Sequence, residues 1–251
     1  MKLVTVADKK IIDLFKENKD ISLVYPLCNY TVGYVNTFDI NAIDDFCLIN
    51  RILTDKELDE LEILLKNSNI KGIIFDDLGI LDVIKDLNIT KILLLDHISN
   101  NSESINYYLD YVDSVVVSTD ISKEEIEYIL NNSKKELVLN IFALKGLMYS
   151  RRLLITNYNK HYQANENKVL KAKIDSKDFI FVENEYGTKA FSFPYYFAKD
   201  LYGHENVMYY WYDVNLLDSE LVYDLVINNN ADNIKTDSFF LDNETFYKVG
   251  D

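Results

Sequence analysis

Three arginines are the first candidates for binding chemistry, because the chain otherwise relies on lysine for positive charge. Among 26 lysines and arginines, the arginines are Arg51, Arg151 and Arg152. A guanidinium binds carboxylates and phosphates through paired hydrogen bonds, which suits it to an anionic substrate. We therefore predict that Arg51 and Arg151 bind substrate and that Arg152 takes part in catalysis.

Other polar side chains directly follow apolar runs that we interpret as strands. Asn50, Asp76 and the pair Asp96-His97 each stand after such a run. Ligands collect at the carboxyl ends of the strands in parallel α/β sheets and barrels, so we predict that Asn50 and Asp76 bind substrate. His97 is a candidate general base, with a structural histidine as the alternative.

Several common catalytic signatures do not occur. The sequence contains no Gly-x-Ser-x-Gly, His-Glu-x-x-His, Cys-x-x-Cys or EF-hand pattern. These patterns mark a nucleophile elbow, zinc sites and a calcium loop. The sequence therefore gives no support for a metal site built by the protein, and we expect no cofactor.

The elements that must position these residues alternate between strand and helix. Apolar runs predict strands at 3–7, 21–27, 46–50, 71–75, 92–95, 114–117 and 137–142, with helices in the connections. Thr54 with Glu57 and Ser122 with Glu125 form capping patterns at two helix starts. Alternation of this kind predicts a parallel sheet, either open or closed. Because no glycine-rich loop follows the first strand, we favour an α/β, TIM-like (β/α) barrel, possibly incomplete.

From residue 168 the pattern changes to aromatic-rich strands. We predict strands at 169–174, 179–183 and 189–193 with a turn at Gly187, a helix at 195–201, a strand at 207–214, a helix at 219–228 and a short strand at 239–241. This arrangement indicates a β-hairpin inserted into the barrel. We interpret 1–251 as one domain, with βα repeats in 1–158, the insertion in 159–206 and the final strand, helix and tail in 207–251.

Composition limits the class of partner. The formal net charge of −15 argues against broad nucleic-acid binding, which depends on lysine and arginine contacts with phosphates. A local basic patch keeps an RNA-binding module open as an alternative. No apolar run is long enough for a membrane span, and no signal peptide is predicted. With only Cys28 and Cys47 as thiols, we expect a cytoplasmic protein without membrane partners.

The segment 137–158 resembles the signature region of the peptidase U32 family, the collagenase-like protease family. The resemblance rests on its strand with Phe142, then Tyr149-Ser-Arg-Arg and Thr156-Asn-Tyr. It extends to Asn50-Arg-Ile-Leu-Thr-Asp-Lys-Glu-Leu, Lys71-Gly-Ile-Ile-Phe-Asp-Asp-Leu-Gly and Glu185-Tyr-Gly-Thr. The resemblance implies a barrel enzyme of peptidase or hydrolase type, with Arg152 at the position of the family's arginine.

Departures from the family pattern concern its best-known chemistry. Asn140 stands where the family has glutamate, and we predict that it binds substrate. Met148 and Leu153 replace the two signature cysteines, and Arg151 replaces a glycine. Some relatives use such cysteines for a [4Fe–4S] cluster in tRNA or quinone hydroxylation. Because no cysteine follows Cys47, the cluster is expected to be absent here.

The resemblance leaves two main functions open. In the first, the chain is a U32-type protein of peptidase kind that binds an anionic small molecule or peptide at the barrel mouth without a cluster. In the second, it is a non-catalytic partner of a longer U32 protein that performs RNA or small-molecule hydroxylation, with its aromatic C-terminal third as the interface.

Overall fold

The predicted barrel is present and closed. The computed structural model describes all residues except 96–99, 165–166 and 243–251. In this described part, eight parallel strands close because β11 pairs with both β1 and β7. These strands are β1 (Lys2–Thr5), β2 (Ile21–Pro26), β3 (Phe46–Ile49), β4 (Gly72–Phe75), β5 (Thr90–Leu94), β6 (Ser114–Val117), β7 (Leu137–Ser150) and β11 (Val207–Tyr212). The fold is therefore a complete TIM-like α/β barrel rather than a partial one.

Helices follow most strands and pack on the outside of the barrel. They are α1 (Lys9–Phe15), α2 (Asp55–Lys66), α3 (Ile80–Ile84), α4 (Ser102–Tyr108), α5 (Lys123–Asn132) and α7 (Ser219–Asn228). The two predicted capping boxes are confirmed, since Thr54 and Ser122 each accept from the third helical amide while Glu57 and Glu125 accept from the cap amide. In the described ranges, no helix is long and apolar enough to cross a membrane.

Two apolar cores follow from this arrangement. One fills the interior of the barrel with side chains such as Leu48, Ile74, Val138 and Trp211. The other lies between the outward faces of the strands and the helices. Strands buried on both faces explain the continuous apolar runs in the sequence, which lack polar alternation. A filled interior leaves only the two ends of the barrel open to ligands.

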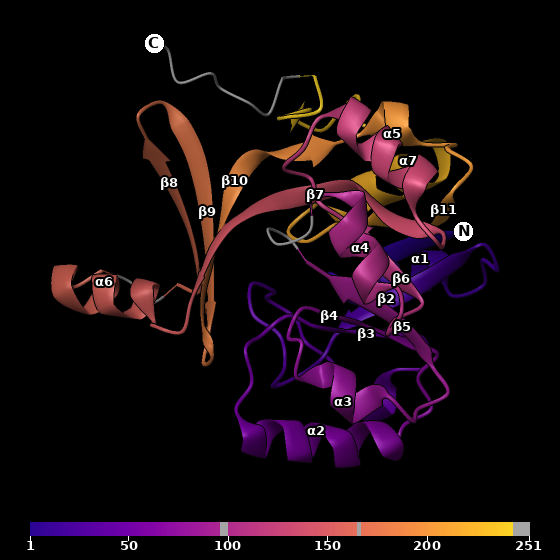
Figure 1. Cartoon of the computed structure of the whole chain (residues 1–251). Helices are drawn as coiled ribbons and strands as arrows, with labels where there is room; N and C mark the ends of the chain where they lie inside the picture. Colours follow the sequence, from indigo (N-terminus) through magenta and orange to yellow (C-terminus); the bar gives the residue numbers. More distant parts are fainter. Residues whose placement is uncertain (96–99, 165–166, 243–251) are drawn as a thin grey trace, which may run out of the picture.

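Beyond the barrel, β7 continues into a three-stranded antiparallel extension. The strand does not end at Phe142, as predicted, but runs to Ser150 and pairs with β10 (Gly187–Phe197). β10 pairs in turn with β9 (Lys177–Asn184), and β9 with β8 (Val169–Ile174). We call β8, β9, β10 and residues 143–150 of β7 the ribbon. Figure 1 shows β8, β9 and β10 standing to the left of the barrel, joined to it by β7.

Helix α6 (Leu154–Tyr162) was not predicted, and its first turn is capped from a distant strand. Leu153 at its N-cap makes no side-chain capping bond. Instead, the Glu183 carboxylate of β9 accepts from the backbone amides of Ile155 and Thr156 at 2.7 and 2.9 Å and from the Thr188 hydroxyl at 2.7 Å. These bonds fasten α6 to the ribbon.

Two further predictions in the C-terminal third were wrong. Residues 195–201 do not form an α-helix, because β10 continues to Phe197 against β7 and a 3₁₀ turn at Lys199–Leu201 follows. Residues 239–241 form a turn, and the short strand is β12 (Thr236–Asp237), which pairs with β10. A second 3₁₀ turn, Ile40–Ala42, lies in the loop after β2. The turn at Gly187 was correct, and its φ is +144°.

Candidate functional site

A small polar cavity lies at the carboxyl end of the barrel, beneath the first part of the ribbon. Its volume is about 40 Å³. Strand ends and the loops that follow them supply one wall, and residues 143–146 of β7 with Lys189 and Phe191 of β10 supply the other. The polar side chains in its lining are Tyr34, Asn50, Thr119, Asn140, Lys145, Lys189, Tyr196, Trp211 and Asp213.

Asp213 is the carboxylate of this lining, and it follows directly after β11. Its Oδ2 accepts a hydrogen bond from the Tyr34 hydroxyl at 2.7 Å. Thr5, which itself accepts from the Trp211 indole at 2.9 Å, also bonds the carboxylate. Burial raises the pKa of Asp213, and the bonds from Tyr34 and Thr5 and the charge of Lys189 oppose the rise without cancelling it. A buried carboxyl with a raised pKa in a cleft is a common mark of a functional site.

Two lysines reach the cavity from the ribbon, and their surroundings differ. Lys145 is 8% exposed, forms an ion pair with Asp120 and donates to the Thr119 carbonyl at 3.1 Å. Lys189 is half-buried, and its charge acts on Asp213. The ion pairs between described residues do not include Lys189. The Lys189 ammonium lies 5.6 Å from the centre of the Phe191 ring, so of the two lysines Lys189 is the one without an ion pair to a described residue.

The two predicted asparagines lie in the lining and play different roles. Asn50 is 3% exposed and uses both ends of its amide on the backbone of Val32, at 2.8 and 3.1 Å. It therefore holds the loop after β2 against the mouth. Asn140 lies opposite Trp211 in the pairing of β7 with β11. Its Oδ1 is buried and has no hydrogen-bond partner among the described residues.

Arg51 lies at the rim of the mouth, where protein groups occupy its guanidinium. It forms an ion pair with Glu57, donates to the Asn29 carbonyl at 2.7 Å and stacks on the Tyr186 ring at 4.0 Å. Tyr186 at the hairpin tip also donates to the Asn29 side chain at 3.0 Å. Arg51 thus fastens the ribbon to the loop after β2.

The other described residues among these predictions lie outside the cavity lining. Arg151 and Arg152 are exposed in the turn after β7. Burial raises the pKa of Tyr149, and the charges of Arg51 and Arg151 lower it while that of Asp76 raises it, so these side chains share one neighbourhood at the rim. His97 lies outside the described residues. The anion-binding role of the arginines therefore stays a prediction.

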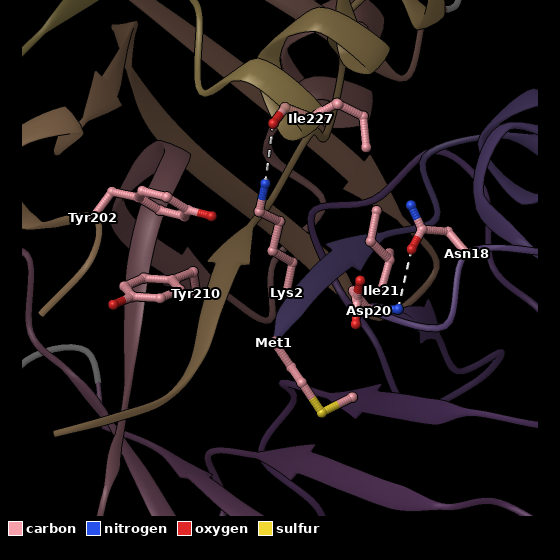
Figure 2. Close-up of a pocket in the computed structure, with 8 residues that line it drawn as sticks. All are labelled: Met1, Lys2, Asn18, Asp20, Ile21, Tyr202, Tyr210 and Ile227. Carbon is pink, nitrogen blue, oxygen red and sulfur yellow. Dashed lines mark hydrogen bonds between the residues drawn. The ribbon is translucent and has the colours of Figure 1, made fainter. Parts of the chain in front are cut away.

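A different kind of hollow lies at the amino end of the barrel. It has a volume of about 430 Å³ and lies beside Lys2, Asp20, Tyr202 and Tyr210. Figure 2 shows Lys2 reaching the Ile227 carbonyl at the end of α7, at 3.4 Å. The same ammonium donates to the Val226 carbonyl and lies 5.1 Å from the centre of the Tyr202 ring. Lys2 therefore ties β1 to the C-terminal end of α7.

Comparison with known protein families identifies the chain. The family model described as peptidase family U32 matches residues 37–176, more than half of the chain. The chain belongs to the peptidase U32 family. No curated protein and no solved structure matches it. The matched segment contains Asn50, Asn140 and Lys145 of the cavity, whereas Lys189 and Asp213 lie beyond it.

The residues of this U32 protein do not fit the four-thiolate cluster that the resemblance associates with some relatives. An iron–sulfur cluster of that type requires four cysteine ligands. The chain has two cysteines, of which Cys28 is exposed and Cys47 is buried. Burial raises the pKa of the Cys47 thiol to about 12, which opposes the thiolate that a metal requires. Met148, at a signature cysteine position, is 45% exposed on the ribbon.

The sequence analysis did not single out Lys145, Lys189 or Asp213. The rule that ligands bind at the carboxyl ends of parallel strands could have found Asp213. Asp213 directly follows the last barrel strand, but we extended that strand to residue 214. Lys145 and Lys189 come to the mouth only because β7 continues past Phe142 and pairs with β10. The rarity of arginine directed the prediction to Arg51, Arg151 and Arg152, whereas the cations that line this cavity are lysines.

Proposed function

We propose that this U32 protein binds a small anionic ligand at the carboxyl end of its barrel, with Lys189 as the cation that pairs with it. The observation that supports the proposal is the contrast among neighbouring cations. Arg51 and Lys145 are engaged by protein carboxylates and carbonyls. Lys189 lines the cavity without an ion pair to any described residue.

Asp213 is proposed as the group that exchanges a proton with the bound ligand. General acid–base catalysis works best when the pKa of the group lies near the operating pH, and burial moves this carboxyl in that direction. The Tyr34 hydroxyl donates to Oδ2 and the Asn215 amide to Oδ1 at 3.4 Å, which fixes the orientation of the carboxylate. Asp213 would therefore act on a ligand that Lys189 positions.

The size of the cavity limits the chemistry. A volume of about 40 Å³ holds on the order of three water-sized groups. A nucleobase is too large for this space, which disfavours the reading as an RNA-binding module. The proposal includes no iron–sulfur cluster, and it places the protein in the cytoplasm on the basis of its two free thiols.

Titration calorimetry with propionate tests the proposal. Lys189→Met removes the cation while keeping a side chain of similar length. We expect it to weaken propionate binding by about tenfold to a hundredfold, the value of one charge-assisted hydrogen bond. Lys171→Met, on an exposed position of the same ribbon, is the matched control and should bind as the wild type does. Equal affinity in Lys189→Met and wild type would exclude this site.

The outer side of the ribbon favours a second function, as the contact surface for a longer U32 protein. Large apolar side chains are exposed on the ribbon and α6: Leu147, Met148, Tyr158, Tyr162 and Ile174. Isolated apolar side chains are normal on a surface, but a group on one projecting unit marks a contact site. Co-purification with a longer U32 protein, lost in Met148→Glu and retained in Lys171→Met, would support this function.

A further inference from the structure

In the described part of the chain, one acceptor of the cavity lining has no hydrogen bond and one cation of the lining has no ion pair. Three buried side-chain atoms in the described residues lack a hydrogen bond: Asp45 Oδ1, Asn140 Oδ1 and His204 Nδ1. Asn140 is the one that lines the mouth, and its free atom is an acceptor. A buried polar atom without a partner costs about 1–3 kcal/mol, so a ligand that donates to it gains affinity.

Acceptors and a donor therefore face the same small space. Asp213 follows β11 two residues after Trp211, the pairing partner of Asn140, and its backbone amide donates to the Phe142 carbonyl at 2.7 Å. Asn140 and Asp213 thus come from adjacent strands at successive levels of one wall. Lys189 lines the same cavity from β10 of the ribbon, and its charge acts on Asp213. A simple anion would satisfy Lys189 but would meet Asn140 and Asp213 as acceptors.

We propose that the ligand is a small zwitterion, whose carboxylate pairs with Lys189 and whose ammonium donates to Asn140 and Asp213. This inference rests on the proposed function and specifies its substrate class. A ligand with an ammonium and a carboxylate close together matches a cavity in which the barrel strands supply acceptors and the ribbon supplies a cation. The volume of about 40 Å³ restricts the ligand to the smallest members of this class.

Three probes with equal numbers of non-hydrogen atoms test the inference by calorimetry on the wild-type protein. Glycine carries both charges, propionate replaces the ammonium by a methyl group, and glycinamide replaces the carboxylate by an amide. We expect glycine to bind at least about tenfold more tightly than either of the others, because each lacks one charge-assisted bond. Asn140→Leu should bring glycine close to the affinity of propionate, because it removes an acceptor that only the ammonium uses.

The outcomes separate this inference from the proposed function. If propionate binds as tightly as glycine, the ligand is a simple anion and the zwitterion is wrong, while the proposed anion site stands and Lys189→Met still tests it. If neither carboxylate binds, both proposals fall. These results come from the wild type alone, so they hold even if Asn140→Leu does not fold.

Discussion

The two ends of the barrel use buried charge in opposite ways. At the amino end, the Lys2 ammonium reaches the carbonyls that end α7, and the Lys71 ammonium lies 3.4 Å from Asp45 Oδ1, an atom without a hydrogen bond. At the carboxyl end, Lys189 and the Asn140 Oδ1 face a cavity without such partners. Polar groups that the protein itself satisfies contribute to stability, whereas those it leaves open are suited to a ligand. Lys2 therefore has a structural role at the amino end, whereas Lys189 at the carboxyl end is suited to a ligand.

The largest expected effect concerns a satisfied carboxylate on the ribbon, Glu183. Glu183→Ala leaves the first amides of α6 without a cap and should lower the free energy of unfolding by about 2–3 kcal/mol. Chemical denaturation followed by circular dichroism measures the change. A loss below about 1 kcal/mol would show that α6 does not depend on this cap.

The pH dependence of the same residue has a definite sign. Burial alone would raise the pKa of Glu183, but hydrogen bonds from Thr156, Thr188 and Ile155 outweigh it, and the pKa lies below its usual 4.5. The stability from Glu183 is therefore present above pH 4.5 and is lost as the pH falls through the lowered folded-state pKa. The difference between wild type and Glu183→Ala should shrink under these acidic conditions.

A pair of lysine variants tests the comparison of the two ends directly. Lys2→Met loses its carbonyl contacts and its place over the Tyr202 ring, so it should reduce stability by about 1–2 kcal/mol. Lys189→Met loses no ion pair to a described residue and should stay within about 0.5 kcal/mol of wild type. Thermal denaturation with propionate titration on both proteins gives the two readouts. The comparison of the two ends is wrong if Lys2→Met, rather than Lys189→Met, loses propionate binding.

Asp213→Asn should have a smaller effect on stability, and in the stabilising direction. The raised folded-state pKa means that the folded chain holds this proton more tightly, so stability falls as the pH rises from 3.8 through the raised value. Removing the buried charge should add about 1 kcal/mol at pH 8 and little near pH 3. Denaturation at both pH values checks the sign. If Asp213→Asn is more stable than wild type and binds glycine more weakly, the Asp213 carboxylate serves ligand binding at a cost in stability.

The smallest effect is expected at the exposed arginine. Arg152→Ala should change stability by less than about 0.5 kcal/mol and leave propionate affinity unchanged, because this side chain lies outside the cavity lining. A tenfold loss of propionate affinity in this variant, measured by calorimetry, would place the binding site at Arg152, after the end of β7.

Local signals in the sequence were sufficient for most of the barrel. Thr54 with Glu57 and Ser122 with Glu125 act within one helical turn, so their capping could be predicted from spacing alone. The α6 helix could not be predicted in this way, because its cap is Glu183, about thirty residues further along the chain. Long-range contacts of this kind leave no short periodic pattern.

The site was harder to predict than the fold for the same reason. The rule that ligands bind at the carboxyl ends of strands placed Asn50 near the mouth, and the family resemblance drew attention to Asn140. Whether a polar group is free depends on its neighbours in space, as Arg51 shows through its contacts with Glu57 and Tyr186. The pairing of β7 with β10 brings Lys189 to the mouth, and no local sequence pattern predicts that pairing.

A crystal structure of the protein grown with glycine tests the central claim most directly. The account predicts density for the ligand in the cavity at the carboxyl end, with its carboxylate at Lys189 and its ammonium at Asn140 and Asp213. Ligand density beside Lys2 at the amino end or at Arg152, with the mouth empty, would contradict it.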